Sequence, residues 1–420
     1  MSHSPEHVVV IGAGIAGLSA AWFLSRKGME VTVVDRDDGT DNCSYGNAGM
    51  IVPSHVIPLA SPGMIAKGLR WMLDKESPFY IRPRLSTKLL SWAWKFRQAS
   101  SEQHVEASGP VLRDLLLESR EIYMAWEQGE EIEFTFGKGG LYMYCRTEEG
   151  LEEERRSMER CRELGIPAEE LSAEEVGERE PGIHLDIKGA VWFPWDGHVW
   201  PRQVLDQLKV RLMERGVTFR WRTEVTGART EGDRIRTLRT ADGEELDAGA
   251  FALCAGAWSG SLGENLGAKL PMLAGKGYSM TLHHPPVRLQ NIAILSEEKV
   301  TCTPLDGGMR FGGTMELTGT DISVTASRLR GLKKSVCRYL PDFSMEDLEG
   351  HDIWVGLRPC SPDGLPYVGQ AGSFKNLFVS TGHAMMGMSL GPSCGLLLSE
   401  LMTRGSSELM HPKIDPNRFT

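Results

Sequence analysis

Three glycines near the start of the chain have the spacing of a dinucleotide-binding turn. Gly12, Gly14 and Gly17 form G-x-G-x-x-G directly after the β-branched run at residues 8–11, which is typical of a buried parallel strand. Glycines at these positions permit a tight turn, close approach of the backbone to a pyrophosphate, and close packing of a helix on a strand. Asp35 ends the next apolar run, where a carboxylate can bind ribose hydroxyls and repel a 2′-phosphate. The pattern predicts a dinucleotide site without naming the dinucleotide, and the alternative is a βαβ unit without a ligand.

The elements that must position these residues follow one another at the N-terminus. A strand at residues 8–11 leads into a helix whose sheet-facing side includes Ala21 and Leu24, and Gly28 stands where that helix would end. Residues 29–34 predict a second strand. This order places the glycine turn at a helix N-terminus, where free N–H groups and the helix dipole favour an anion.

Length and composition bound the rest of the molecule. With 420 residues the chain is long enough for two or three domains of about 150 residues each. The net charge of −10 argues against nucleic acid as a partner, since proteins that bind its backbone present a basic face. The eight cysteines form no C-x-x-C motif and no Cys/His ligand spacing, which favours reduced thiols in a cytoplasmic protein over disulfides or a metal site.

Two stretches of the sequence could indicate contact with a membrane. Residues 8–25 carry no charge, but no Lys or Arg precedes them and the glycines interrupt them, so we do not expect a signal peptide. No other stretch approaches the roughly 20 apolar residues of a spanning helix. Residues 64–98 combine aromatic and basic side chains. They predict either helices that cover a domain with exposed basic ends, or a surface that lies peripherally on a membrane.

Segments suited to a nucleotide-binding fold recur late in the chain. Pro201 stands near the start of a predicted helix, short strands fill residues 217–256, and residues 351–403 hold a strand followed by a glycine-rich helix. Between these segments, helices at 107–129 and near 325–339 accompany β-rich material. Two interleaved domains therefore describe the chain better than consecutive ones.

Several motifs occur in an order that matches one family over nearly the whole chain. They are the opening fingerprint, CSYGNAG at 43–49, KGYS at 276–279, GLRPCSPDGLPYVG at 356–369, and TGHAMMGMSLGPSCG at 381–395. The chain resembles the FAD-dependent amine and amino-acid oxidoreductases of the D-amino-acid oxidase and glycine oxidase group. Within that group it looks most like the bacterial D-amino acid dehydrogenases. Each motif alone is weak, but their combination is specific.

The resemblance implies an α/β fold with two interleaved domains. A Rossmann-like FAD-binding domain would comprise residues 1–85, 196–266 and 351–420. An α+β substrate-binding domain, built on a mixed or antiparallel sheet, would comprise residues 86–195 and 267–350.

The resemblance also implies a set of residues that hold FAD. They are Gly12, Gly14, Ile15, Ala16, Gly17, Asp35, Arg36, Ser44, Asn47, Ala48, Gly49, Val225, Ala255, Gly256, Gly382, His383, Gly387 and Met388. The first turn would hold the pyrophosphate, and the start of the last helix would face the flavin N1/O2 edge, which is anionic in reduced flavin. Some relatives attach flavin through a cysteine in the region of Cys360, but the spacing here does not match closely. We therefore expect noncovalent FAD.

Three residues are candidates for substrate binding. A guanidinium can bind a carboxylate with two charge-assisted hydrogen bonds, and in the resembled family the Arg of the G-L-R-P motif, here Arg358, does so. Tyr278 would donate a second hydrogen bond to that carboxylate, and the alternative is a tyrosine packed in the sheet. His55 would line the pocket, and the alternative is a structural histidine.

The activity implied is oxidative deamination of D-amino acids, with D-proline and apolar side chains as suitable substrates. Hydride transfer from Cα to flavin N5 would give an imino acid, then a keto acid and ammonia, so we assign no general base. Electrons would pass to a quinone or dye. The alternatives are an oxygen-using oxidase of glycine, sarcosine or D-proline, and a noncatalytic flavoprotein subunit. We expect a cytoplasmic protein, with the inner face of the membrane as the alternative; the enantiomer and the oligomeric state stay open.

Overall fold

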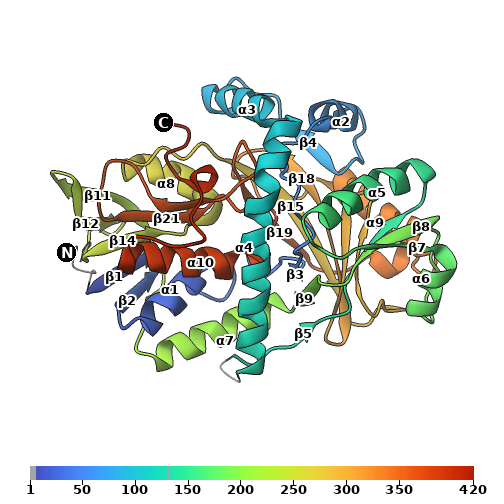
Figure 1. The fold of residues 1–420 in the computed structure, drawn as a ribbon, viewed down its shortest axis with the longest axis horizontal. Helices are drawn as coiled ribbons and strands as arrows, with labels where there is room; N and C mark the ends of the chain where they lie inside the picture. The colour runs from blue at the N-terminus through green and yellow to red at the C-terminus, as the bar shows by residue number, and fades with distance from the viewer. Residues whose placement is uncertain (1–5, 130–131) are drawn as a thin grey trace.

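The computed structural model describes residues 6–129 and 132–420. The first five residues of the predicted FAD-binding domain therefore lie outside the described part of the chain. Two large sheets divide the molecule, one on the side of the N-terminus and the other opposite it (Figure 1). The long helix α4 (Glu102–Gln128) crosses between them in this view.

The first sheet has the order β10-β2-β1-β14-β21-β20, in which β20 alone is antiparallel to its neighbour. Its strands are β1 (His7–Ile11), β2 (Glu30–Val34), β10 (Thr218–Arg220), β14 (Ala250–Leu253), β20 (Tyr367–Gln370) and β21 (Leu377–Thr381). The central strand β1 is buried on both faces, as its β-branched run predicts. The predicted Rossmann-like arrangement of distant segments is confirmed.

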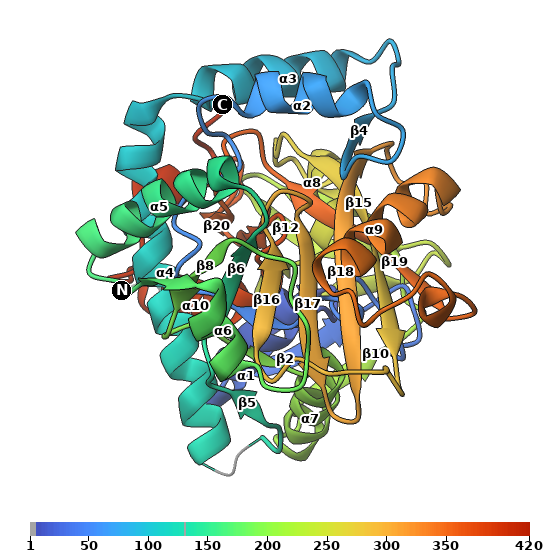
Figure 2. The same cartoon turned by 90° about the vertical axis from the view of Figure 1, so that its right-hand side faces the viewer.

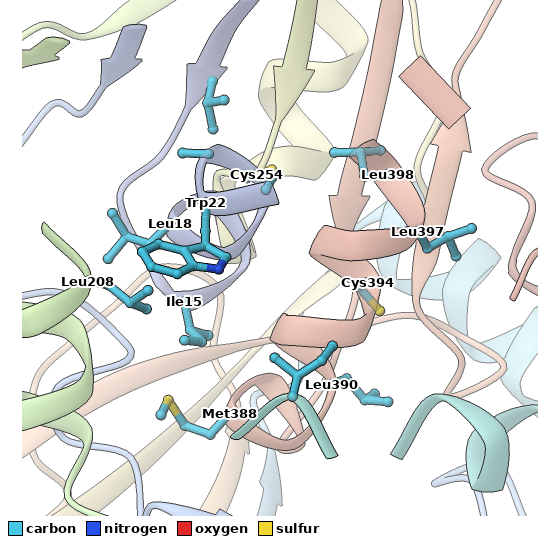
Figure 3. Close-up of a cluster of buried hydrophobic side chains, with 14 of the residues drawn as sticks. Ile15, Leu18, Trp22, Leu208, Cys254, Met388, Leu390, Cys394, Leu397 and Leu398 are labelled. Atoms are coloured by element: carbon cyan, nitrogen blue, oxygen red, sulfur yellow. The ribbon is translucent and has the colours of Figure 1, made fainter. Parts of the chain in front are cut away.

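Helices from three parts of the chain pack beside this sheet. They are α1 (Ile15–Arg26), α7 (Pro201–Glu214) and α10 (Gly387–Arg404), with α8 (Ser259–Asn265) nearby. Figure 3 shows side chains of α1 and α10 in one buried cluster, joined by Leu208 of α7. Gly391 and Gly395 let α10 approach α1 closely, because a Cβ on Gly395 would lie 2.6 Å from the backbone of Ser19. This contact brings the N-termini of two helices, far apart in sequence, into one region.

The second sheet has nine strands, with the path β19-β15-β18-β17-β16-β6-β8-β7 and β4 beside β18. Its strands are β4 (Phe79–Ile81), β6 (Leu141–Cys145), β7 (Glu169–Ser172), β8 (Gly189–Phe193), β15 (Leu273–Leu282), β16 (Ile292–Leu295), β17 (Val300–Leu305), β18 (Gly308–Leu317) and β19 (Ile353–Cys360). Most neighbours are antiparallel, but β16–β6 and β18–β4 are parallel. The sheet is mixed, as expected.

The remaining elements are short or peripheral. The small sheets contain β3 (Met50–Ile51), β5 (Phe136–Gly137) and β9 (Gly197–Val199), and separately β11 (Val225–Glu231), β12 (Arg234–Thr240) and β13 (Glu245–Asp247). The other helices are α2 (Met64–Met72), α3 (Thr87–Ala99), α5 (Glu148–Glu163), α6 (Ala173–Arg179), α9 (Ala326–Tyr339) and the 3₁₀ turns Gly256–Trp258, Glu346–Leu348 and Pro412–Ile414. Pro201 is the first residue of α7, as predicted.

Two strands pair differently from the predicted division of the chain. Strand β19 belongs to the nine-stranded sheet through β15, although residues 351–420 were assigned to the FAD-binding domain. Strand β4, within residues 1–85, pairs with β18 of the same sheet. Local composition predicts that a strand forms, whereas its pairing partner depends on tertiary contacts. The division into two domains otherwise stays a prediction.

Helices α2 and α3 lie together at one end of the molecule, and α7 lies toward the other (Figures 1 and 2). Helices α2 and α3 carry exposed apolar side chains and lie within residues 64–98, the stretch of aromatic and basic residues described above. In the described residues, every helix is too short or too polar to cross a membrane.

Candidate active site

The predicted pyrophosphate turn is built from close backbone contacts. Gly12 has φ +107°, and a Cβ there would lie 2.6 Å from the carbonyl oxygen of Cys254. A Cβ on Gly17 would lie 1.8 Å from the carbonyl oxygen of Gly12. Helix α1 begins at Ile15, whose N–H donates to Ser44 Oγ at 3.1 Å. The glycines therefore close the turn onto β14 and leave the start of α1 facing a cavity.

The end of β2 forms the wall beside this turn. Asp35 Oδ2 accepts from the N–H of Ala13 at 2.7 Å and Oδ1 accepts from the N–H of Asp37 at 3.0 Å, while burial raises the pKa of the carboxyl. The carboxylate thus holds the glycine turn as well as facing the predicted ribose site. The Arg36 guanidinium lies 3.9 Å from the ring centroid of Trp258. Arg36 is among the predicted cofactor residues, whereas Trp258 is not. A stacked cation and indole make a flat surface suited to an adenine.

The loop at 44–49 is fixed from its outer side by two residues that the sequence reading also missed. Arg310 Nη1 donates to the carbonyl oxygens of Tyr45 at 3.0 Å and Asn47 at 2.6 Å, and burial lowers the pKa of Arg310 to about 10. Ser279 Oγ donates to the carbonyl oxygen of Gly46 at 2.8 Å. The motif KGYS contains Ser279, so its position beside Tyr278 was a usable signal.

The far end of the site combines a turn with a helix N-terminus. Gly382 has φ +78° and Ala384 φ +47°, and the N–H of Ala384 donates to the carbonyl oxygen of Pro359 at 2.9 Å. His383 is buried between them, and burial lowers its pKa to about 4. Its Nε2 has no hydrogen-bond partner among the described residues. Helix α10 begins at Gly387, three residues after the predicted start at Ala384, and its first turn lies at the cavity.

A single cavity of about 960 Å³ joins the two ends. Most of the predicted cofactor and substrate residues line it, namely Gly12, Gly14, Ile15, Ala16, Asp35, Arg36, Ser44, Asn47, Ala48, His55, Val225, Ala255, Gly256, Tyr278, Arg358, His383, Gly387 and Met388. Gly17, Gly49 and Gly382 do not. A Cβ on any of these three would collide with a carbonyl oxygen or with Tyr367, so they serve close packing behind the wall.

Arg358 has the surroundings expected of a carboxylate-binding group. Its Nη1 donates to the carbonyl oxygen of Thr314 at 2.8 Å, and it has no ion pair within the described ranges. The guanidinium lies across Gly277, where a Cβ would be 2.0 Å from Nη1. Burial lowers the pKa of Arg358, which records the cost of holding an unpaired cation. This geometry argues against the alternative of a surface or ion-paired arginine.

Tyr278 is turned away from Arg358. Residues alternate between the faces of a strand, so Gly277 and Ser279 face the cofactor side of β15 while Tyr278 shares the opposite face with Met280, in the core near α9. The Tyr278 hydroxyl donates to Glu316 and accepts from the N–H of Thr325 at 2.9 Å, and burial raises its pKa to about 12. The predicted hydrogen bond to substrate is therefore not supported, and the alternative of a tyrosine packed in the sheet describes the geometry.

His55 lies in the cavity wall, as predicted. Its Nδ1 is 3.2 Å from Ser54 Oγ, and Nε2 has no hydrogen-bond partner in the part of the chain that the structure describes. Burial, together with the charge of Lys299, lowers the pKa of His55 to about 4. The imidazole is thus neutral near pH 7.

All eight cysteines are free. Cys360 is fully buried, and burial raises the pKa of its thiol to about 11. A buried neutral thiol is a poor nucleophile, which favours the expectation of noncovalent FAD without testing it.

These features fit an elongated dinucleotide with a redox-active end. Two helix N-termini face the cavity, the orphaned His383 Nε2 offers a polar contact at one end, and Asp35 stands at the other. The volume is at the upper end of that of ligand pockets, about 300–1,000 Å³. Fold and site together define a dinucleotide-binding flavoprotein that carries a second, mixed sheet beside the nucleotide-binding one.

The chain belongs to the family described as FAD dependent oxidoreductase (DAO), whose match covers residues 7–401. It is therefore an FAD-dependent oxidoreductase, as the sequence predicts.

Named relatives and solved structures extend over the whole chain. It is 31% identical to "D-amino acid dehydrogenase" of Granulibacter bethesdensis over 98% of this chain and 99% of the relative. It is 30% identical to the protein of that name from Vibrio vulnificus over 95% and 96%. The fold is similar to that of glycine oxidase from Geobacillus kaustophilus, with TM-score 0.79, 24% identity and full coverage of both chains. It is also similar to L-proline dehydrogenase from P. horikoshii, with TM-score 0.76, 20% identity and coverage of 99% and 98%.

Proposed function

We propose that this FAD-dependent oxidoreductase oxidatively deaminates D-amino acids and passes the electrons to a quinone or a dye. The observation that carries the proposal is Arg358, whose guanidinium has no ion pair among the described residues, is held in the cavity by Thr314 and lies over Gly277. A bidentate hydrogen bond to a substrate carboxylate would neutralise it. Relatives named D-amino acid dehydrogenase match nearly the whole chain, which supports the substrate class.

The residues of the chain bind and orient the substrate in this proposal. Arg358 fixes the carboxylate, and the half-buried His55 lines the same cavity. FAD, when bound, supplies the hydride acceptor. The first turn of α10 provides N–H groups and a positive dipole end where negative charge develops. Orientation and electrostatics are thus the contributions of the protein.

A panel of D- and L-amino acids, assayed by dye reduction under air and under nitrogen, tests the proposal. We expect reduction with D-amino acids, including D-proline, at similar rates in both atmospheres. Reduction by L-amino acids alone would overturn the enantiomer. Failure of the purified single chain with every amino acid would favour the noncatalytic subunit instead.

A second candidate is an oxygen-using oxidase of glycine, sarcosine or D-proline. The similarity in fold to glycine oxidase favours it, although a likeness at 24% identity carries no further than fold. Hydrogen peroxide formed in air, stoichiometric with imino acid, would establish this alternative over the dehydrogenase.

We also propose that FAD is held without a covalent bond. The buried thiol of Cys360 supports this. After acid precipitation we expect the yellow colour in the supernatant, and colour left in the pellet would contradict the proposal.

We propose that the protein is cytoplasmic and contacts an anionic membrane through the α2–α3 surface. This surface consists of exposed apolar residues, namely Ile65, Leu69, Leu73, Leu85, Leu90 and Trp94. Basic residues of the same segment accompany them, namely Lys67, Arg70, Lys75, Arg82, Arg84, Lys88, Lys95 and Arg97, whereas its acids are Asp74 and Glu76. Three of these bases, Lys67, Arg82 and Lys88, form ion pairs with acids from other parts of the chain. Apolar side chains among cations suit the headgroup region of anionic lipids.

Co-sedimentation with anionic vesicles tests the membrane contact. The exposed fractions of Leu73 and Leu90 are 88% and 65%, so L73E and L90E should release the protein without unfolding it. Met213, 54% exposed on α7 at the other end of the molecule, offers the matched control M213E, which should still bind. Equal binding of all three variants, or none by the unmodified protein, would contradict this surface.

A further inference from the structure

A buried carboxylate lies directly behind the His55 part of the cavity wall. Asp196 is 1% exposed and does not line the cavity. Its Oδ1 accepts from the N–H of Ser54 at 3.0 Å, and its Oδ2 accepts from Ser54 Oγ at 2.5 Å. No ion pair to Asp196 occurs within the described ranges. Nothing in the proposed reaction uses this carboxylate so far.

Hydrogen bonds connect His55, Ser54 and Asp196 in a series that leads from the cavity into the protein, and they set the direction in which each proton is donated. When Asp196 is ionised, Ser54 donates its single hydroxyl proton to it, so Ser54 Oγ can only accept from His55. His55 Nδ1 therefore carries a proton, and Nε2 presents a lone pair. Because Nε2 has no protein partner among the described residues and His55 lines the cavity, this lone pair is available to a bound molecule.

Charged and titratable groups from several elements surround this hydrogen-bonded series. Lys299 stands near His55 and lies 3.7 Å from Glu154 of α5, while Arg120 of α4 and Cys161 of α5 lie near Asp196. Cys161 Sγ lies 3.2 Å from the carbonyl oxygen of Ser54. Burial raises the pKa of Asp196 to about 7, although the bonds from Ser54 and the charge of Arg120 oppose this. The carboxyl can therefore exchange a proton near neutral pH.

We infer that His55, Ser54 and Asp196 form a proton relay that takes one proton from the substrate ammonium group. The ammonium N–H bond breaks as a proton moves to His55 Nε2. The Nδ1 proton passes to Ser54 Oγ, whose own proton passes to Asp196 Oδ2. The substrate keeps the nitrogen electron pair as a neutral amine. His55 touches the substrate, and Ser54 and Asp196 act through it.

The reaction needs such a step, and the wall of the cavity places the groups for it. An amino acid near pH 7 is a zwitterion, while loss of hydride from Cα requires a free amine electron pair. A Cβ on Gly313 would lie 3.6 Å from the carbonyl oxygen of Lys299, and the next residue, Thr314, holds Arg358. His55 and the carboxylate-binding arginine thus line one cavity, together with Lys299 and Thr314. This inference rests on the proposed amino-acid substrate.

Stopped-flow reduction of the bound flavin across pH tests the relay in the holoenzyme. With the unmodified protein, the rate constant should rise with pH through about 7 as Asp196 ionises. S54A and D196N should lower it tenfold to a hundredfold near neutral pH, on the order of a general-base contribution. That deficit should shrink as the pH approaches the amine pKa, because the substrate then arrives already deprotonated. Identical pH profiles for all three proteins would overturn the relay.

Matched variants separate proton transfer from a structural role. S54A keeps the backbone N–H bond to Asp196, and S54T, which retains a hydroxyl, should restore the rate. S259A removes another fully buried serine hydroxyl and should leave the pH profile unchanged. A purely structural role would lower the melting temperature of D196N without changing its pH profile.

Two further measurements complete the test. Substrate analogues with lower amine pKa should show a smaller loss in S54A than ordinary amino acids. Infrared difference spectra between acid and alkaline pH should contain a carboxyl band that D196N lacks, and its presence in D196N would contradict the assignment. If none of the amino acids tested reduces the flavin of the unmodified protein, the proposed function fails. If the unmodified protein is active and the variants show the same rates and pH profiles, only the relay fails.

Discussion

The two ends of the cavity are built in different ways. The adenine end comes mainly from one continuous segment, in which the Gly12 turn, α1 and Asp35 lie close in sequence and hydrogen-bond to each other. The substrate end assembles Thr314, Arg358 and His383 from separate segments and brings them together with His55, which lies more than 250 residues earlier in the chain. An element of local contacts can be recognised by its pattern, whereas an assembled site depends on strand pairing and side-chain direction. The variants below separate the two ends, because FAD affinity reports one and substrate kinetics reports the other.

Arg358→Ala should have the largest effect. Removing a cation that binds the substrate carboxylate in a buried site costs about 2–5 kcal/mol, so kcat/KM should fall by about thirtyfold to several thousandfold. The FAD dissociation constant, measured by fluorescence titration, should stay within about twofold of the original if the two ends are independent. Unchanged substrate kinetics would contradict the assignment of Arg358.

Gly277→Ala should damage the same end without removing a functional group. The new Cβ would lie 2.0 Å from Arg358 Nη1 and force the guanidinium to move. A displacement of this size can cost up to about a hundredfold, and we expect a rise of at least about tenfold in KM. The control is Gly227→Ala in β11, where a Cβ meets nothing within 4 Å. Equal kinetics for the two alanine variants would show that Arg358 does not depend on Gly277.

Gly17→Ala should affect the adenine end. Its Cβ would lie 1.8 Å from the carbonyl oxygen of Gly12, and overpacking of this kind costs about 1–3 kcal/mol. The FAD dissociation constant should rise about tenfold, while kcat at saturating FAD should change little. Gly177→Ala in α6, where a Cβ has open space, is the matched helical control. A fall in kcat at saturating FAD would show that the two ends are coupled.

Trp258→Ala should have the smallest effect. It removes the indole on which Arg36 stacks, and an exposed cation–π contact contributes about 0.5–1 kcal/mol. We expect a twofold to fivefold rise in the FAD dissociation constant, about what that energy allows, and unchanged KM for substrate. Titration of the apoprotein with FAD measures this dissociation constant. A change in substrate KM alone would place Trp258 at the substrate end and contradict its assignment to the adenine end.

Much of the fold could be predicted because its signals are local. The β-branched run of β1, Pro201 at the start of α7 and the short strands of residues 217–256 all formed as expected. The pairing of β19 with β15 did not follow from its sequence, and that pairing places Arg358 over Gly277. The family motif therefore identified the arginine correctly as a candidate, but only the sheet explains why it is free to bind a ligand.

Side-chain direction accounts for the clearest difference between the predicted site and the observed one. The motif KGYS pointed to Tyr278, yet the pleat turns Tyr278 to Glu316 and its neighbour Ser279 to the FAD loop. A period of two residues means that a shift of one position exchanges the faces of a strand. Arg310 and Asp196 were missed for a related reason, because each acts on a loop that is distant in sequence.

The sequence by itself determined the dinucleotide turn, its helix and the acid that ends the second strand. Their geometry depends on glycine φ angles and on contacts within a few tens of residues, which the residue types dictate. Only the tertiary structure decided which side chains meet at the substrate end. There, strand register, the close crossing of α1 and α10, and burial set the chemistry of Arg358, His55 and Asp196. Those quantities belong to the packed chain, because each depends on residues that are neighbours in space alone.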